Sequence, residues 1–151
     1  MTPEERALLA ACGEFCHITT ADRRGKIEVG GLNPEFDDSL VLRGSKRDKA
    51  VYLCPVSSIE NVKDFIGANA SDQPTLYVYR IGAETLSQKS CGPDIGFLVN
   101  LVDEVDYTIA VSLQRGTISC YEAISRAELT GPEEIDNPRY KQPGDEDAEL
   151  L

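Results

Sequence analysis

The segment FCHITTADRRGKIEVGGLNP (residues 15–34) contains His17, the only histidine of the chain. Its first residues alternate as in a strand, with Phe15, His17 and Thr19 on one face and apolar side chains on the other. Such a strand packs one face on a core and borders a cleft with the other. Residues 21–39 are polar and rich in glycine, so we expect a loop around a short helical turn. This loop has three apolar anchors, Ile27, Val29 and Leu32.

The flanking segments predict a helix before this strand, and a helix and several strands after it. Thr2 and Glu5 are spaced as in a capping box, so we expect a helix over residues 2–12. The same spacing recurs at Ser57, at the start of a strongly amphipathic segment that predicts a helix over residues 57–69. Further strands are predicted at residues 40–46, 49–55, 74–82, 97–105, 107–113 and 116–124.

This order of elements predicts an α+β fold in one domain, residues 1–130, with an N-terminal helix and one strong internal helix. The strands follow one another rather than alternating with helices, which favours a mostly antiparallel sheet over a βαβ array. From residue 131 the chain changes character: residues 131–151 include three prolines, seven acidic residues and only two basic ones. That composition predicts an acidic, mobile tail.

Composition narrows the class of protein. The chain has 151 residues and a formal net charge of −11. This charge argues against a surface that follows nucleic-acid phosphates, which needs a basic patch. The five cysteines form no CxxC pair, so we expect reduced, mostly buried thiols. The acidic N-terminus and the absence of a long apolar run predict a cytoplasmic protein, of a bacterium or an infected host, that does not enter a membrane.

The familiar motifs of enzyme sites are absent from the sequence. There is no GxGxxG and no GxxxxGK[ST], so the common nucleotide-binding folds receive no support. A single histidine makes a histidine-based metal site improbable, and we predict no metal. Cys16 and His17 are neighbours on a strand and point to opposite faces, which disfavours a catalytic dyad between them.

The order of the segments nevertheless resembles the ADP-ribosyltransferase-like superfamily. This superfamily includes the poly-ADP-ribose polymerases, the DarT DNA-modifying toxins and the RNA 2′-phosphotransferases. Its members carry an HxT strand, then an IxxxGL segment, then a VYL or IYF strand followed by a short helix. The matching residues here are His17, Ile18 and Thr19, then Ile27, Gly31 and Leu32, then Val51, Tyr52 and Leu53. The resemblance covers about residues 14–130 and implies a split antiparallel sheet.

The resemblance also implies roles in binding NAD as a substrate. His17 and Thr19 would hold the ribose, and the backbone at Ile18 would hold the carboxamide. Tyr52 would stack on the electron-poor nicotinamide ring, with Phe65 as a second ring-stacking aromatic. The function implied is transfer of ADP-ribose from NAD to a macromolecular or small-molecule acceptor.

The resemblance further implies a glutamate near the last strand, to stabilise the cation that forms as nicotinamide leaves. No acidic residue occurs between Asp106 and Glu122, so Glu122 is the candidate, with Glu104 or Asp106 as alternatives. Two other readings remain open. One is an acidic interaction protein, of the immunity or inhibitor type, that keeps a nucleotide-binding fold without catalysis. The other is an RNA 2′-phosphotransferase relative, which Arg115 favours because those enzymes use basic residues in place of the glutamate.

Overall fold

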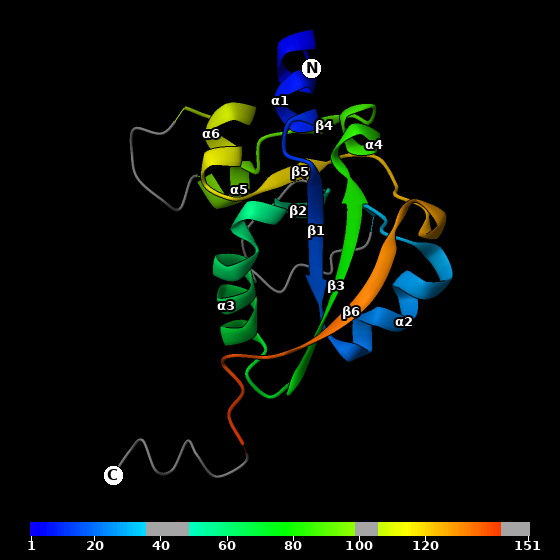
Figure 1. Cartoon of the computed structure of the whole chain (residues 1–151), viewed down its shortest axis with the longest axis vertical. Coiled ribbons are helices and arrows are strands. Elements are labelled where there is room, and N and C mark those ends of the chain that lie inside the picture. The colour runs from blue at the N-terminus through cyan, green and yellow to red at the C-terminus, as the bar shows by residue number, and fades with distance from the viewer. Residues whose placement is uncertain (36–48, 99–105, 143–151) are drawn as a thin grey trace.

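The computed structural model describes residues 1–35, 49–98 and 106–142 and is organised around one antiparallel sheet (Figure 1). The sheet has six strands in the order β4-β5-β2-β1-β3-β6, and every neighbouring pair is antiparallel. This confirms the prediction of an α+β fold with an antiparallel sheet. The strands are β1 (Glu14–Thr19), β2 (Val51–Pro55), β3 (Thr75–Gly82), β4 (Cys91–Gly92), β5 (Ile118–Cys120) and β6 (Thr130–Asp136).

Helices cover the sheet on both faces and at one end. In Figure 1, α3 lies on one side of β1 and α2 on the other, while α1, α4 and α6 gather at the end that carries the N-terminus. Among the described residues, no helix is both long and apolar enough to cross a membrane. The helices are α1 (Pro3–Ala10), α2 (Ala21–Gly30), α3 (Ile59–Asn69), α4 (Ala83–Ser87), α5 (Ile95–Leu98) and α6 (Ile109–Gln114), with 3-10 turns η1 (Val56–Ser58) and η2 (Arg126–Glu128).

The two faces of β1 contact two separate cores. Phe15 belongs to the larger core, which also contains Leu53 and Tyr79. Cys16 and Ile18 belong to a smaller core that lies beneath α3. Both faces of the strand therefore contact a core, whereas the sequence predicted one apolar face and one aromatic and polar face. The predicted cleft beside the strand is present, since residues 16–19 line a cavity.

Several predicted elements agree with the structure. The capping box of Thr2 and Glu5 is formed at the start of α1, and the strand that carries His17 is β1. The internal helix is also present, but its capping differs from the prediction. Ser57 lies in the turn η1, and the N-cap of α3 is Ser58, whose side chain makes no capping hydrogen bond.

Two segments are more helical than predicted: one was expected as a loop around a short helical turn, the other as a strand. Residues 21–30 form α2, anchored by the buried Ile27, whereas Val29, an expected anchor, is 91% exposed. Residues 109–114 form α6 rather than a strand, because the Thr108 hydroxyl caps the helix by accepting a hydrogen bond from the Val111 amide at 3.2 Å.

The remaining strand predictions fall partly outside the described residues. Of the strand predicted over 97–105, residues 97 and 98 belong to the helix α5, and residues 99–105 lie outside the described residues. The strand predicted over 40–46 lies wholly outside it. The strand predicted over 116–124 is present but shorter, as β5.

The prediction of a mobile tail from residue 131 is wrong for its first part, because residues 130–136 form β6. This strand pairs with β3 from Thr75–Asp136 to Arg80–Thr130. Beyond it, the buried Asn137 side chain donates to the carbonyl oxygens of Gly67, Ala70 and Gln73 at 3.2, 3.0 and 2.8 Å. Composition signalled a polar segment, but an edge strand needs few apolar side chains because its outer face is solvated.

Replacing Asn137 is expected to loosen the junction between β6 and the end of α3. We expect Asn137→Ala to lower the free energy of unfolding by about 2 kcal/mol, because buried carbonyl groups lose their donor. Asn69→Ala is a matched control: Asn69 is exposed and donates only to the Phe65 carbonyl oxygen. Urea denaturation of both variants measures the difference, and equal losses would contradict this role of Asn137.

A buried tyrosine ties α2 to the sheet. The Tyr79 hydroxyl donates to Glu28 at 2.7 Å, and the Arg126 guanidinium donates to the same carboxylate at 3.0 Å. The hydrogen bond from Tyr79 is the main cause that lowers the pKa of Glu28. Burial, followed by the bond to Glu28, raises the pKa of Tyr79 to about 12.

We expect Tyr79→Phe to lower the free energy of unfolding by about 1–2 kcal/mol at neutral pH, because it removes a hydrogen bond to a charged group. The lowered pKa of Glu28 means that its contribution is complete above its ordinary pKa and is lost as the pH falls through the folded value. The difference between wild type and Tyr79→Phe should therefore narrow in acid. Denaturation at pH 7 and pH 3 measures it, and a difference that stays constant would contradict the assignment.

Candidate functional site

The site is a cavity of about 390 Å³ at the place where β1 and β2 separate. The two strands pair only at Phe15–Pro55 and Cys16–Cys54. From the second pair onward, residues 16–19 of β1, residues 51–54 of β2 and the preceding Ala50 line the cavity. Its volume lies within the range of about 300–1,000 Å³ that is usual for small-molecule sites.

His17 spans the opening between the two strands. Its Nδ1 lies 3.0 Å from the carbonyl oxygen of Tyr52 on β2. A carbonyl oxygen can only accept, so Nδ1 carries the proton and donates it. In the neutral ring this fixes Nε2 as a hydrogen-bond acceptor. The histidine is thus held in one orientation by the backbone of the facing strand.

The side chains of His17 and Tyr52 leave their strands on opposite faces of the sheet, although both residues line the cavity. Because Cys54 faces Cys16, alternation along β2 places Tyr52 on the α3 side of the sheet, whereas His17 lies on the side of Phe15. In an unbroken sheet these two side chains would be separated. Here the cavity is lined from both sides, by Ile66 of α3 and by Ile27 of α2.

All the residues predicted to bind the nucleotide line this cavity: His17, Ile18, Thr19, Tyr52 and Phe65. Thr19 is buried, and Tyr52 is half-buried. Phe65 belongs to the apolar periodicity of α3, which is typical of a core residue, yet it is 44% exposed and lies in the cavity wall.

Glu122 is not among the residues that line the cavity. Glu122 is exposed. It follows the C-terminal end of β5, whereas Gly116 precedes the N-terminal end. Its carboxylate accepts a hydrogen bond from the Ser90 amide. Glu122 was predicted to act at the site, but the structure places it outside the cavity that the other predicted residues line. Of the alternatives, Asp106 also does not line the cavity, and Glu104 lies outside the described residues.

A different carboxylate, Asp94, lines the cavity next to the position expected for the glutamate. It is 1% exposed, its Oδ2 accepts from the Thr117 hydroxyl at 2.8 Å, and its Oδ1 accepts from the Phe97 amide at 3.2 Å. The Ser112 hydroxyl accepts from the Asp94 amide at 3.0 Å and donates to the Thr117 carbonyl oxygen at 2.7 Å. These hydrogen bonds hold the Asp94 carboxylate against Thr117, the residue that follows Gly116.

Sequence reasoning missed Asp94 because it lies outside the strand that the resemblance identified. The available signal was local: Asp94 follows a Gly-Pro pair and precedes a short apolar segment, as an N-cap residue does. That local signal does not indicate that Thr117, 23 residues later in the chain, lies beside Asp94.

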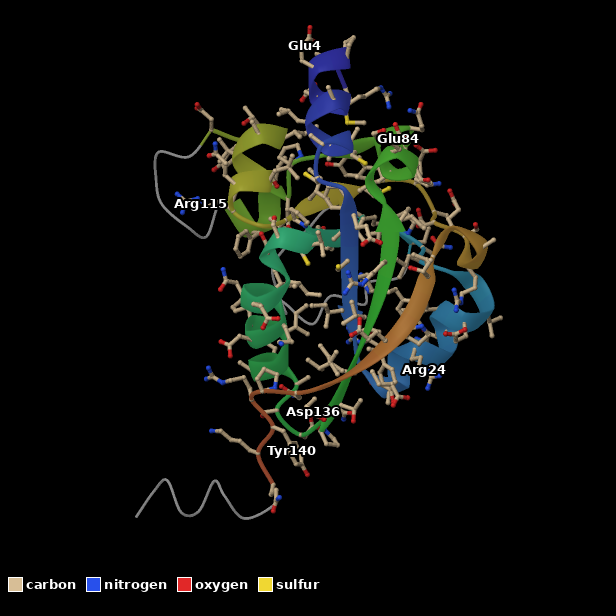
Figure 2. All side chains as sticks on the ribbon, in the orientation of Figure 1. Glu4, Arg24, Glu84, Arg115, Asp136 and Tyr140 are labelled. Carbon is tan, nitrogen blue, oxygen red and sulfur yellow. The ribbon has the colours of Figure 1, made fainter. Side chains whose placement is uncertain are left out.

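Among the described residues that line the cavity, positive charges outnumber negative ones, although the chain is acidic. Arg23 and Lys26 of α2 and Arg115 line it, and Asp94 is the one carboxylate among the described lining residues. Figure 2 shows Arg115 at the end of α6, well apart from α2, the helix that carries Arg23, Lys26 and the labelled Arg24. Cations on separate walls suit a ligand with several negative charges along its length.

Two glycines of the wall occupy positions that need glycine. Gly31 has φ of +70°, and a Cβ there would lie 2.2 Å from the Ile124 carbonyl oxygen. Leu32, which follows it, exchanges backbone hydrogen bonds of 2.8 Å with Ile124. Gly116 has φ of +84°, and a Cβ there would meet the Ser58 side chain at 2.9 Å. Both turns are therefore fixed where they border the cavity.

Comparisons of the chain with protein-family models, with curated proteins and with solved structures find no match. Within residues 1–35, 49–98 and 106–142, no group of three or more histidine, cysteine or acidic residues is placed to hold a metal ion.

Proposed function

We propose that this cavity binds NAD and that the protein transfers ADP-ribose from it to an acceptor. The observation that carries the proposal is the gathering of His17, Tyr52 and Phe65 around the opening between β1 and β2. These are the residues to which the resemblance gives ribose and nicotinamide contacts. All three line one cavity, and His17 is joined to the Tyr52 backbone by the hydrogen bond at its Nδ1.

The cavity has aromatic, hydrogen-bonding and cationic residues, and these suit the nicotinamide, the ribose and the diphosphate of NAD respectively. Tyr52 and Phe65 offer aromatic surface to the cationic nicotinamide ring. The Nε2 atom of His17 offers an acceptor for a ribose hydroxyl. Arg23, Lys26 and Arg115 offer positive charge to the diphosphate.

The proposed reaction breaks the bond between C1′ of the ribose and the nicotinamide nitrogen. Nicotinamide leaves as a neutral molecule with the bonding electron pair, and the ribose carbon becomes an oxocarbenium-like cation. A nucleophile of the acceptor then bonds to C1′ and loses its proton to solvent or a base. The buried carboxylate of Asp94 takes the electrostatic role that the resemblance gives to a glutamate, since a fixed negative charge stabilises developing positive charge.

A second candidate is a reaction of the RNA 2′-phosphotransferase type. The described lining residues include three cations and one carboxylate, and this excess of positive charge favours a phosphate-bearing second substrate. The two candidates differ in what stimulates turnover. Nicotinamide release that requires a 2′-phosphorylated RNA would favour the second.

The test of the proposal is nicotinamide release from NAD by the full chain, with and without candidate acceptors. We expect release by wild type and about a 10-fold lower kcat/KM for Tyr52→Leu, which removes the ring but keeps the carbonyl bonded to His17. Tyr107→Leu is the matched control, because Tyr107 is 52% exposed and does not line the cavity. Absence of both release and NAD binding in wild type would contradict the proposal. Binding without release would instead support a non-catalytic nucleotide-binding protein.

A further inference from the structure

Four of the five cysteines lie in two facing pairs in the sheet. Cys16 of β1 is the register partner of Cys54 of β2, and Cys91 of β4 is the register partner of Cys120 of β5. All five cysteines are free thiols in this structure. Cys12, after α1, is the one outside these pairs.

Cysteines directly opposite each other on paired strands can form a disulfide without movement of the backbone. Directly opposed residues of antiparallel strands have Cα atoms about 4.5 or 5.5 Å apart. Both values lie inside the range of about 4.4–6.8 Å in which disulfides form. Register alone therefore makes each pair capable of closing.

Two features distinguish Cys16 and Cys54 from the other pair. Both line the cavity, so a small reagent that enters the cavity meets them, whereas Cys91 and Cys120 do not line it. Cys16 also has Arg80 of β3 as its register partner on the other side.

The hydrogen bond with Cys54 favours the thiolate of Cys16. A hydrogen bond from the neighbouring Cys54 thiol is the main cause that lowers the pKa of Cys16; burial raises this pKa, and the Arg80 guanidinium lowers it. Glu14 and Glu133, which pair with Arg80 at 3.6 and 3.3 Å, act in the opposite direction. The thiolate is the reactive form of cysteine, so Cys16 is the attacking member of the pair and Cys54 the resolving one.

We propose that Cys16 and Cys54 form a thiol-modification site that a small peroxide converts to a disulfide. The Cys16 thiolate attacks one peroxide oxygen, the O–O bond breaks, and Cys16 becomes a sulfenic acid while hydroxide leaves. The Cys54 sulfur then attacks the Cys16 sulfur, and the sulfenic oxygen leaves as water. In sum, two thiols lose two electrons and two protons, and hydrogen peroxide is reduced to two molecules of water.

The disulfide would tie β1 to β2 at the last pair before the strands separate. Cys16 precedes His17 directly, and the same strand pair carries the His17–Tyr52 hydrogen bond. Oxidation thus fixes one end of the cavity opening. This inference concerns the thiols alone and does not depend on the identity of the ligand.

The experiment treats the reduced full chain with hydrogen peroxide, blocks the remaining thiols under denaturing conditions, and maps the peptides by mass spectrometry. We expect peptides joined through Cys16 and Cys54, with a mass loss of about 2 Da, before any join through Cys91 and Cys120. We also expect the thermal midpoint to rise by about 5–10 °C and to return on addition of a dithiol reductant.

Two variants serve as controls. Cys91→Ala keeps the proposed site and should still form the Cys16–Cys54 disulfide with the rise in the midpoint. Cys54→Ala lacks the resolving thiol, so Cys16 should advance to sulfinic acid and the midpoint should not rise. The proposal is overturned if, in wild type, Cys16 and Cys54 remain unjoined after Cys91 and Cys120 have joined, or if both pairs join at the same rate. The wild-type mapping decides this even if a variant fails to fold.

Discussion

His17→Ala is expected to lower kcat/KM for nicotinamide release by at least about 100-fold, since small misplacements of a reacting group cost this much. Two effects add. The variant loses the Nε2 acceptor for the ribose, and it loses the Nδ1 donor that holds the Tyr52 carbonyl oxygen across the opening. Steady-state kinetics with NAD as the varied substrate measures the loss.

His17→Gln separates these two effects. Its amide nitrogen can still donate to the Tyr52 carbonyl oxygen, but its remaining atoms cannot reproduce the position of Nε2. We expect most of the activity loss with little loss of thermal stability. Gln88→Ala, an exposed change beyond α4, is the control. If His17→Ala retained wild-type kcat/KM, the histidine would be a structural residue of the strand.

Asp94→Asn is expected to lower kcat/KM about 100-fold, because loss of one fixed electrostatic partner of a transition state typically costs this much. The substitution preserves size and removes the charge. Thr117 and Phe97 lose their charged acceptor, so we also expect about 1–3 kcal/mol of lost stability. The kinetics are therefore measured well below the thermal midpoint of the variant.

Glu122→Gln is the matched control for Asp94→Asn. It makes the same kind of change at the acidic residue that the sequence favoured, but outside the cavity. We expect its kcat/KM to equal that of wild type. The opposite pattern, with activity lost in Glu122→Gln and kept in Asp94→Asn, would show that the carboxylate is wrongly assigned.

The elements that could be predicted from the sequence are those in which local pattern and tertiary contact agree. The capping box of Thr2 and Glu5 and the alternation around His17 are local signals, and both elements formed as expected. Residues 109–114 show the opposite case. Their β-branched side chains favour a strand, but the Thr108 cap and the burial of Ile109 and Ser112 select a helix.

The site was predictable only in part, for a physical reason. His17, Thr19 and Tyr52 carry a sequence pattern, and all three line the cavity. Asp94 reaches the same cavity through hydrogen bonds with Ser112 and Thr117, which come from other segments of the chain. Long-range placement of this kind leaves no periodic trace in the sequence. The separation of β1 from β2 after two register pairs leaves none either, although it determines where the cavity lies.

An NMR titration of the isotope-labelled full chain with NAD tests the central claim most directly. We predict that the largest shifts of backbone amides will occur at residues 16–19, 51–54 and 115–117, which line the cavity from both strands and from the turn before β5. Amides of β6, which do not line the cavity, should move least. Absence of shifts at NAD concentrations above about 1 mM, where even weak specific binding is detected, would contradict the account. So would shifts confined to residues outside the cavity.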